Sequence, residues 1–168
     1  MIVAGLGVLG FSARLWRLQC YHRAFSDSVI SLLGAELAGV ARSAQPIQTV
    51  VRARLCARVV TIQLNYHRGI WTLWLRMPCS APTGFLLAEI DGPESFTAQL
   101  PDPEIRGIVL SLIQRHHVQI HLDPVTERNP ERLSVMICRF RHPQPPPRDL
   151  REIVAKTEEV ARLLEAVS

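Results

Sequence analysis

The first part of the chain spaces its apolar residues with the period of a helix. From Phe11 to about Val40 they recur at three- and four-residue steps: Phe11, Leu15, Leu18, Phe25, Val29 and Leu32. This spacing places them on one side of an α-helix. The segment 43–46 ends in proline, and the residue before a proline is disfavoured in the helical conformation. We therefore predict a long amphipathic helix and then a short linker.

The next part alternates apolar and polar residues with a period of two, which is the pattern of a half-buried β-strand. Between Thr49 and Val60, one face carries Val51, Ala53, Leu55, Ala57 and Val59, and the other carries Arg52, Arg54, Cys56 and Arg58. Residues 65–69 have the composition of a turn, and residues 70–77 are rich in β-branched and aromatic side chains. The two strands are predicted to form an antiparallel hairpin, followed by a short strand from Phe85 to Ile90.

The second half of the chain predicts two helices and two further strands. Asp102 is a typical helix N-cap residue, and Pro103 is favoured at the first helical position. Residues 118–122 and 133–140 have the alternation of strands. The proline-rich segment 142–147 is predicted to be a stiff connector. It leads into a final helix with the apolar stripe Leu150, Ile153, Val154, Val160, Ala161 and Leu164.

The predicted order of elements, α-β-β-β-α-β-β-α, indicates an α+β fold. Its mostly antiparallel sheet has about five strands, with the helices on one face. A chain of 168 residues is long enough for one hydrophobic core. We divide it into an apolar segment 1–13, a helical segment 14–42 and an α+β domain 47–168.

The apolar segment 1–13 carries no charge, and Arg14, Arg17 and Arg23 follow it closely. A helix that crosses a bilayer needs about 20 apolar residues, so this segment is too short to span one alone. A secretory signal would have basic residues before its apolar part, and here they come after it. Two interpretations stay open. The segment is either a membrane anchor, interfacial or the end of a longer span, or the buried start of an ordinary helix. As an anchor, it places the arginines on the cytoplasmic side.

The basic residues are almost all arginines. Lys156 is the single lysine, and the formal net charge at pH 7 is +4. Arginine binds phosphate and stacks on aromatic rings better than lysine does, which fits an anionic partner. Arginines interleaved with aromatic residues are typical of single-strand-binding surfaces. We expect such a surface on the hairpin, at Arg52, Arg54, Arg58, Arg68, Trp71, Trp74 and Arg76. Trp71 and Trp74 differ in strand parity, which predicts that at least one of them lies in the core.

No combination of residues predicts catalysis, a metal site or a cofactor. The cysteines lack CxxC spacing and lie in or beside apolar runs, at Cys20, Cys56, Cys79 and Cys138. His117 and His121 would share one face of a helix, but their neighbours predict a strand. Four strand positions span roughly 13 Å, which is too far for one metal ion. The sequence identifies no small-molecule substrate either.

These patterns predict a non-catalytic interaction or scaffold domain in the cytoplasm. It is held at a membrane if segment 1–13 is an anchor, and it belongs to a larger assembly with a protein partner or further copies of itself. A nucleic-acid-binding module that uses the arginine and aromatic hairpin is the alternative. An enzyme of unassigned reaction is a second alternative, for which no nucleophile, base and oxyanion site can be assembled from the sequence.

Overall fold

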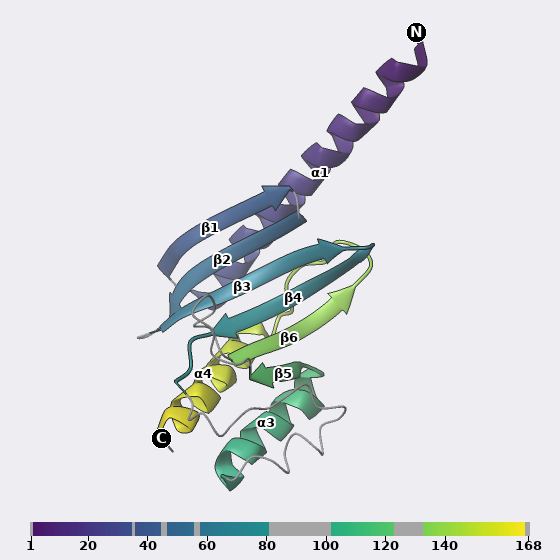
Figure 1. The fold of residues 1–168 in the computed structure, drawn as a ribbon. Coiled ribbons are helices and arrows are strands. Elements are labelled where there is room, and N and C mark those ends of the chain that lie inside the picture. Colours follow the sequence, from purple (N-terminus) through teal and green to yellow (C-terminus); the bar gives the residue numbers. More distant parts are fainter. Residues whose placement is uncertain are drawn as a thin grey trace.

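Three helices and six strands form the part of the protein that the computed structural model describes, namely residues 2–34, 36–44, 47–55, 58–80, 102–122 and 133–166 (Figure 1). In chain order they are α1 (Ile2–Leu33), β1 (Glu36–Ala44), β2 (Ile47–Leu55), β3 (Arg58–His67), β4 (Ile70–Met77), α3 (Pro103–His116), β5 (Gln119–Leu122), β6 (Leu133–Phe140) and α4 (Leu150–Ala166). The expected α+β class is confirmed. The strand expected at 85–90 lies outside the described residues.

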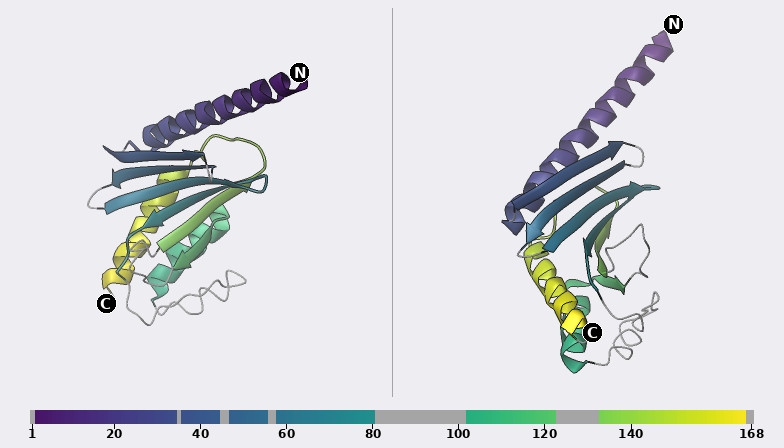
Figure 2. Two further views of the ribbon diagram at one scale, coloured as in Figure 1. Left: turned by 45° about the horizontal axis from the view of Figure 1, so that its top comes forward. Right: turned by 60° about the vertical axis from the view of Figure 1, so that its left-hand side comes forward.

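The six strands form one antiparallel sheet in the order β1-β2-β3-β4-β6-β5. The first four strands are a meander in which each strand pairs with the next. The order then departs from the sequence, because β6 pairs with β4 and places β5 at the far edge. All three helices lie on one face of this sheet, as expected (Figure 2).

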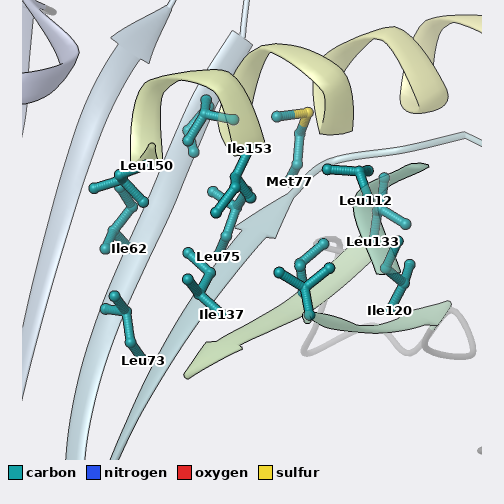
Figure 3. Packing of buried hydrophobic residues seen from close by; sticks show 14 of the residues in the cluster. Ile62, Leu73, Leu75, Met77, Leu112, Ile120, Leu133, Ile137, Leu150 and Ile153 are labelled. Carbon is teal, nitrogen blue, oxygen red and sulfur yellow. The ribbon is translucent and has the colours of Figure 1, made fainter. Parts of the chain in front are cut away.

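The core fills the space between that face and the helices. One row of paired residues crosses five strands and is at most 8 % exposed: Val51, Ile62, Leu75, Val135 and Ile120. Leu150 and Ile153 of α4 lie over the same face, and Leu112 of α3 lies over its β5 end (Figure 3). Burial of these aliphatic side chains is the main force that holds the helices to the sheet.

Several local predictions are confirmed. The Asp102 side chain accepts hydrogen bonds from the backbone N–H groups of Glu104 (2.7 Å) and Ile105 (3.3 Å), and so caps α3. The apolar stripe predicted for α4 is buried along its whole length. Arg68 and Gly69 form the turn between β3 and β4 with positive φ angles of 49° and 83°, which match a tight two-residue hairpin turn.

The predicted extension of the first helix to about Val40 is wrong, because α1 ends at Leu33 and residues 36–44 form β1. Gly34 has a φ of 58°, and its N–H donates to the carbonyl of Ile30 at 3.0 Å. A left-handed glycine is a common helix terminator. The chain beyond it pairs with β2 along residues 36–44, with one irregularity between residues 37 and 39, and helix periodicity does not reveal this pairing. Residues 43 and 44, expected in a linker, therefore belong to this strand.

The prediction of one strand over residues 49–60 is also wrong. β2 ends at Leu55 and β3 begins at Arg58, and these two residues are paired across the hairpin. The reversal changes which side chains share a face. Val60 therefore lies in the core, and Val59 points to the other side. No glycine, proline, asparagine or aspartate stands between the strands, so the alternation resembles a single uninterrupted strand.

Candidate functional site

The sheet face opposite the helices carries no helix in the part of the chain that the structure describes (Figure 2). We call this surface of strands β2 to β6 the outer face. Strand pairing assigns to it Gln48, Val50, Arg52, Arg54, Val59, Thr61, Gln63, Asn65, His67, Ile70, Thr72, Trp74, Arg76, Gln119, His121, Ser134, Met136 and Arg139. It is polar and basic, in contrast to the aliphatic inner face.

The charged residues that strands β2 to β6 contribute to the outer face are all basic. Strands β2 to β6 contain no aspartate or glutamate. Arg52, Arg54 and Arg139 are exposed, and Arg76 is half-buried. In β1, Glu36 is paired with Arg54 and is the one acidic residue of the six strands. Four arginines that share a surface with a single carboxylate set up a positive potential that attracts anions.

One row of the outer face runs across five strands and pairs Arg52 with Thr61, Thr61 with Arg76, Arg76 with Ser134 and Ser134 with His121. The long side chains alternate here with small hydroxyl residues that are buried between them. The Nε of Arg76 and the Nε2 of His121 are buried and have no hydrogen-bond partner among the described residues. Buried polar atoms without partners are rare in folded proteins, so these two atoms are an unusual feature of this row.

The next row supplies an aromatic group. The indole of Trp74 lies on the imidazole of His121, with ring centroids 5.7 Å apart and planes inclined by 44°. Met136 is opposite Trp74, and its sulfur accepts a hydrogen bond from the Nε of Arg139 at 3.1 Å. Nearby, the amide of Gln63 donates to the side-chain oxygen of Asn65 at 2.9 Å. This arrangement places a flat apolar ring, amides and guanidinium groups on one surface.

A shallow hollow lies beside Arg52, where β1 meets β2. Its volume is about 300 Å³, and it is lined by Gly39, Val40, Ala41, Val50 and Arg52. The strand pairing shifts register between residues 37 and 39, and a side chain at Gly39 would meet nothing within 4 Å. The hollow therefore offers room for a small group next to an exposed guanidinium.

The structure brings together four of the seven predicted site residues: Arg52, Arg54, Trp74 and Arg76. Arg68 lies in the exposed turn at the end of the hairpin. Trp71 faces the other way, as its parity predicts, and is 2 % exposed in the core. It contributes to the fold and does not reach the outer face.

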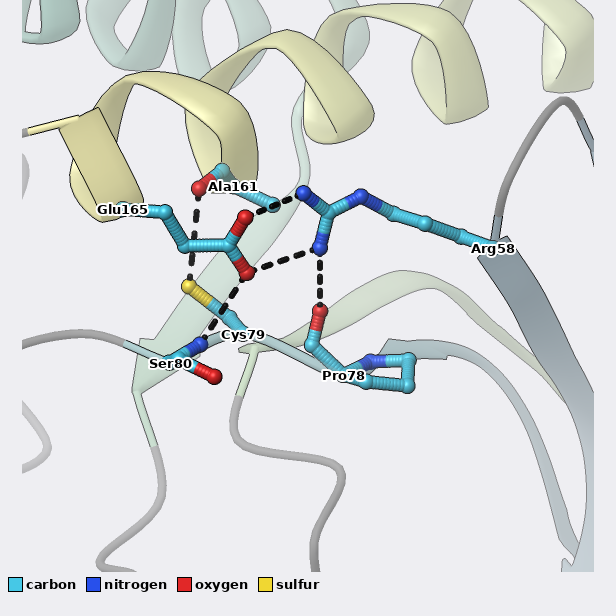
Figure 4. Close-up of polar contacts among 6 residues, drawn as sticks. All are labelled: Arg58, Pro78, Cys79, Ser80, Ala161 and Glu165. Carbon is cyan, nitrogen blue, oxygen red and sulfur yellow. Dashed lines mark hydrogen bonds and ion pairs between the residues drawn. The ribbon is translucent and has the colours of Figure 1, made fainter.

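Arg58 also lies on the helix-covered side, because the turn before β3 reverses the parity on which its assignment depended. Its guanidinium forms a two-pronged ion pair with Glu165 of α4 and donates to the carbonyl of Pro78 at 3.0 Å (Figure 4). The backbone N–H of Ser80 donates to the same carboxylate at 3.1 Å. The hydrogen bonds from Arg58 hold the pKa of Glu165 below its usual range. Arg58 therefore links the sheet to the end of α4.

Sequence reasoning missed Arg139 and His121 as members of the site. They belong to β6 and β5, and they reach the neighbourhood of Trp74 only because β6 pairs with β4. The alternation of residues 133–140 predicts which side of its strand Arg139 lies on. It does not predict which strand pairs with β6.

Two thiols and one further histidine are partly or fully buried, or paired with another group. Burial raises the pKa of the Cys138 thiol to about 11, so very little of it is thiolate near neutral pH. The Cys79 thiol is buried and donates to the carbonyl of Ala161. His116 is paired through Nδ1 with Asp149 at 2.5 Å. None of these groups is placed beside the outer face as a nucleophile with its base.

Comparisons with models of known protein families, with curated proteins and with solved structures find no match to this chain.

We expect Cys20, which is exposed on α1, to react with an alkylating reagent at pH 8 about 100-fold faster than Cys138. The thiolate is the reactive form, and only about one part in a thousand of a thiol with a pKa near 11 is ionised at pH 8. Timed alkylation followed by peptide mass spectrometry gives both rates. Equal rates would contradict the burial of Cys138.

Proposed function

We propose that this protein is a non-catalytic interaction domain whose outer face binds single-stranded nucleic acid. The observation that carries the proposal is the gathering of Arg52, Arg54, Arg76 and Arg139 on one sheet face. Glu36 of β1, which is paired with Arg54, is the one acidic residue in the six strands of the sheet. Phosphate neutralisation by arginine supplies most of the affinity in such complexes.

The aromatic and amide groups favour a nucleic acid over other polyanions. Trp74 presents a ring beside guanidinium groups, and stacking on such a ring contributes about 1–3 kcal/mol per base. The amides of Gln63 and Asn65 can pair with the edges of bases. Alternate residues of a strand lie about 6.6 Å apart, so Arg52 and Arg54 can bind successive phosphates of an extended strand.

A protein partner or a further copy of this chain is less well supported on this face. Stable protein interfaces have an apolar centre with aromatic anchors. Among the described residues, Ile70 is the one large apolar side chain of the outer face that is exposed, and it lies at the end of the hairpin. The centre of the face is occupied by polar and charged groups.

The test is a fluorescence anisotropy titration of the full chain with labelled 20-nucleotide oligo(dT) and oligo(U) at several salt concentrations. We expect R52A/R54A to weaken binding about tenfold, and to reduce the dependence of log K on log salt by about 1.4, or about 0.7 per lost phosphate contact. The matched control is R151A/R162A, which removes two exposed charges from α4 on the other side of the sheet. It should bind like the unmodified chain.

Three outcomes would overturn the proposal. One is an absence of binding at low salt. Another is an equal loss of affinity in both double variants, because binding would then follow net charge alone. The third is a self-associated species in sedimentation experiments that R52A/R54A disrupts while no oligonucleotide binds, since the outer face would then be a contact between copies. Circular dichroism of each variant checks that the fold is intact.

A further inference from the structure

Helix α1 is longer than its contact with the rest of the protein requires. It contains 32 residues, which corresponds to about 48 Å at 1.5 Å per residue. In the part of α1 whose side chains are described, the buried ones begin at His22 and continue with Phe25, Ser26, Val29 and Leu33. The N-terminal half extends away from the sheet, as both views show (Figures 1 and 2).

The projecting half has a sharp change in composition. Residues 2–13 include no charged residue, and the polar members are limited to Ser12. Trp16 then follows and is 66 % exposed, with the exposed Arg17 next to it and the exposed Arg23 about two turns further along. Trp16 and Arg23 also line a surface hollow of about 340 Å³. An apolar segment, an exposed tryptophan and exposed arginines thus succeed one another along one helix.

We propose that residues 2–13 of α1 insert into one leaflet of an anionic lipid bilayer, with Trp16 at headgroup depth and Arg17 and Arg23 against lipid phosphates. Twelve helical residues extend about 18 Å. This exceeds half of a hydrocarbon core of about 30 Å but does not cross it. Among the described residues, no helix is long and apolar enough to span a membrane.

The side chains that follow the apolar segment match the chemistry of the membrane surface. Tryptophan is enriched at the boundary between hydrocarbon and headgroups, which is where the length of the segment would place Trp16. Each arginine near an anionic leaflet contributes about 1 kcal/mol of attraction. The charge of Arg17 and Arg23 is therefore complementary to this partner.

The glycines of residues 2–13 favour a helix that is inserted in lipid over one that is exposed to water. Gly5, Gly7 and Gly10 each disfavour a helix in water by about 1 kcal/mol relative to alanine. In hydrocarbon, the backbone must satisfy its hydrogen bonds internally, which enforces the helix despite these residues. If the partner were a second copy of α1, charged residues beside an apolar seam would set the pairing of the two helices. Segment 2–13 has no charged residue.

The first test is flotation of the full chain with vesicles of phosphatidylcholine, with and without 30 mol% phosphatidylglycerol. We expect binding to the anionic vesicles and a loss of about tenfold in the L6D variant, because a charge inside the hydrocarbon is costly. The matched control is Q114D, which adds the same charge at an exposed position of α3 and should float normally. Residue 6 lies in the projecting half of α1, so circular dichroism should show an intact sheet in both variants.

The second test measures the depth of Trp16 with brominated lipids. Fluorescence of the full chain should be quenched most strongly by bromine near the headgroups, and W16F should abolish most of this quenching while it still floats. Equal flotation of L6D and the unmodified chain would overturn the proposal. So would loss of flotation in R52A/R54A but not in L6D, which would assign lipid binding to the outer face, or a lipid-free dimer that L6D dissociates. The proposed nucleic-acid binding is measured with oligonucleotides in the absence of vesicles, so either proposal can fail alone.

Discussion

Replacement of Trp71 by alanine is expected to lower the free energy of unfolding by about 4 kcal/mol, the largest effect of any single change considered. The indole is 2 % exposed. Its ring lies within 4.7–6.3 Å, centroid to centroid, of the rings of Tyr66, Tyr21, His22 and Phe140. It therefore joins α1, β3 and β6 to β4, and its removal leaves a cavity lined by four elements. Urea denaturation followed by circular dichroism measures the loss.

Trp74 is the matched control for this prediction, because it lies three residues further along β4 on the outer face and is half-buried. W74A should cost less than about 2 kcal/mol, since fewer protein atoms surround its ring. A loss below about 1 kcal/mol in W71A, or an equal loss in the two variants, would contradict the assignment of Trp71 to the core.

Replacement of Glu165 by glutamine is expected to cost about 2 kcal/mol at pH 7, because it breaks charge-assisted hydrogen bonds with Arg58. The folded state lowers the pKa of Glu165, so the stabilisation is present above the ordinary carboxyl pKa of about 4.3. It is lost as the pH falls through the lower folded-state value. The stabilities of the unmodified protein and E165Q should therefore converge below about pH 4.

Urea denaturation at pH 7 and pH 3 tests this second prediction. E159Q makes the same change of charge on the same helix without touching Arg58, and it should differ little from the unmodified protein at either pH. A difference between E165Q and the unmodified protein that persists undiminished at pH 3 would show that the ion pair is not its cause.

The elements predicted correctly from sequence have strong local signals. α3 begins with an aspartate cap and a proline, and α4 has an uninterrupted apolar stripe, so each is defined by residues within a few positions. The turn at residues 68 and 69 has a glycine where positive φ is needed. By contrast, β1 is poor in β-branched residues, and the turn between β2 and β3 lacks the usual turn residues. Both features depend on pairing between strands, which cannot be inferred from the local periodicity of the sequence.

The candidate site could be predicted only in part, for the same reason. Arg52, Arg54, Trp74 and Arg76 share a face because of parity within strands, and parity is visible in the sequence. Arg58 was assigned to the wrong face because an unrecognised turn reversed that parity. The contribution of β5 and β6 depends on the order of strands in the sheet, which is set by tertiary packing.

The most direct test of the central claim is an NMR titration of the isotope-labelled full chain with a 20-nucleotide single strand. The account predicts chemical-shift changes in the amides of β2, β3 and β4 and in the indole N–H of Trp74. The indole of Trp71 and the amides of α4 should stay unchanged. Changes confined to α1 or to α3 and α4, or no changes at low salt, would contradict binding on the outer face.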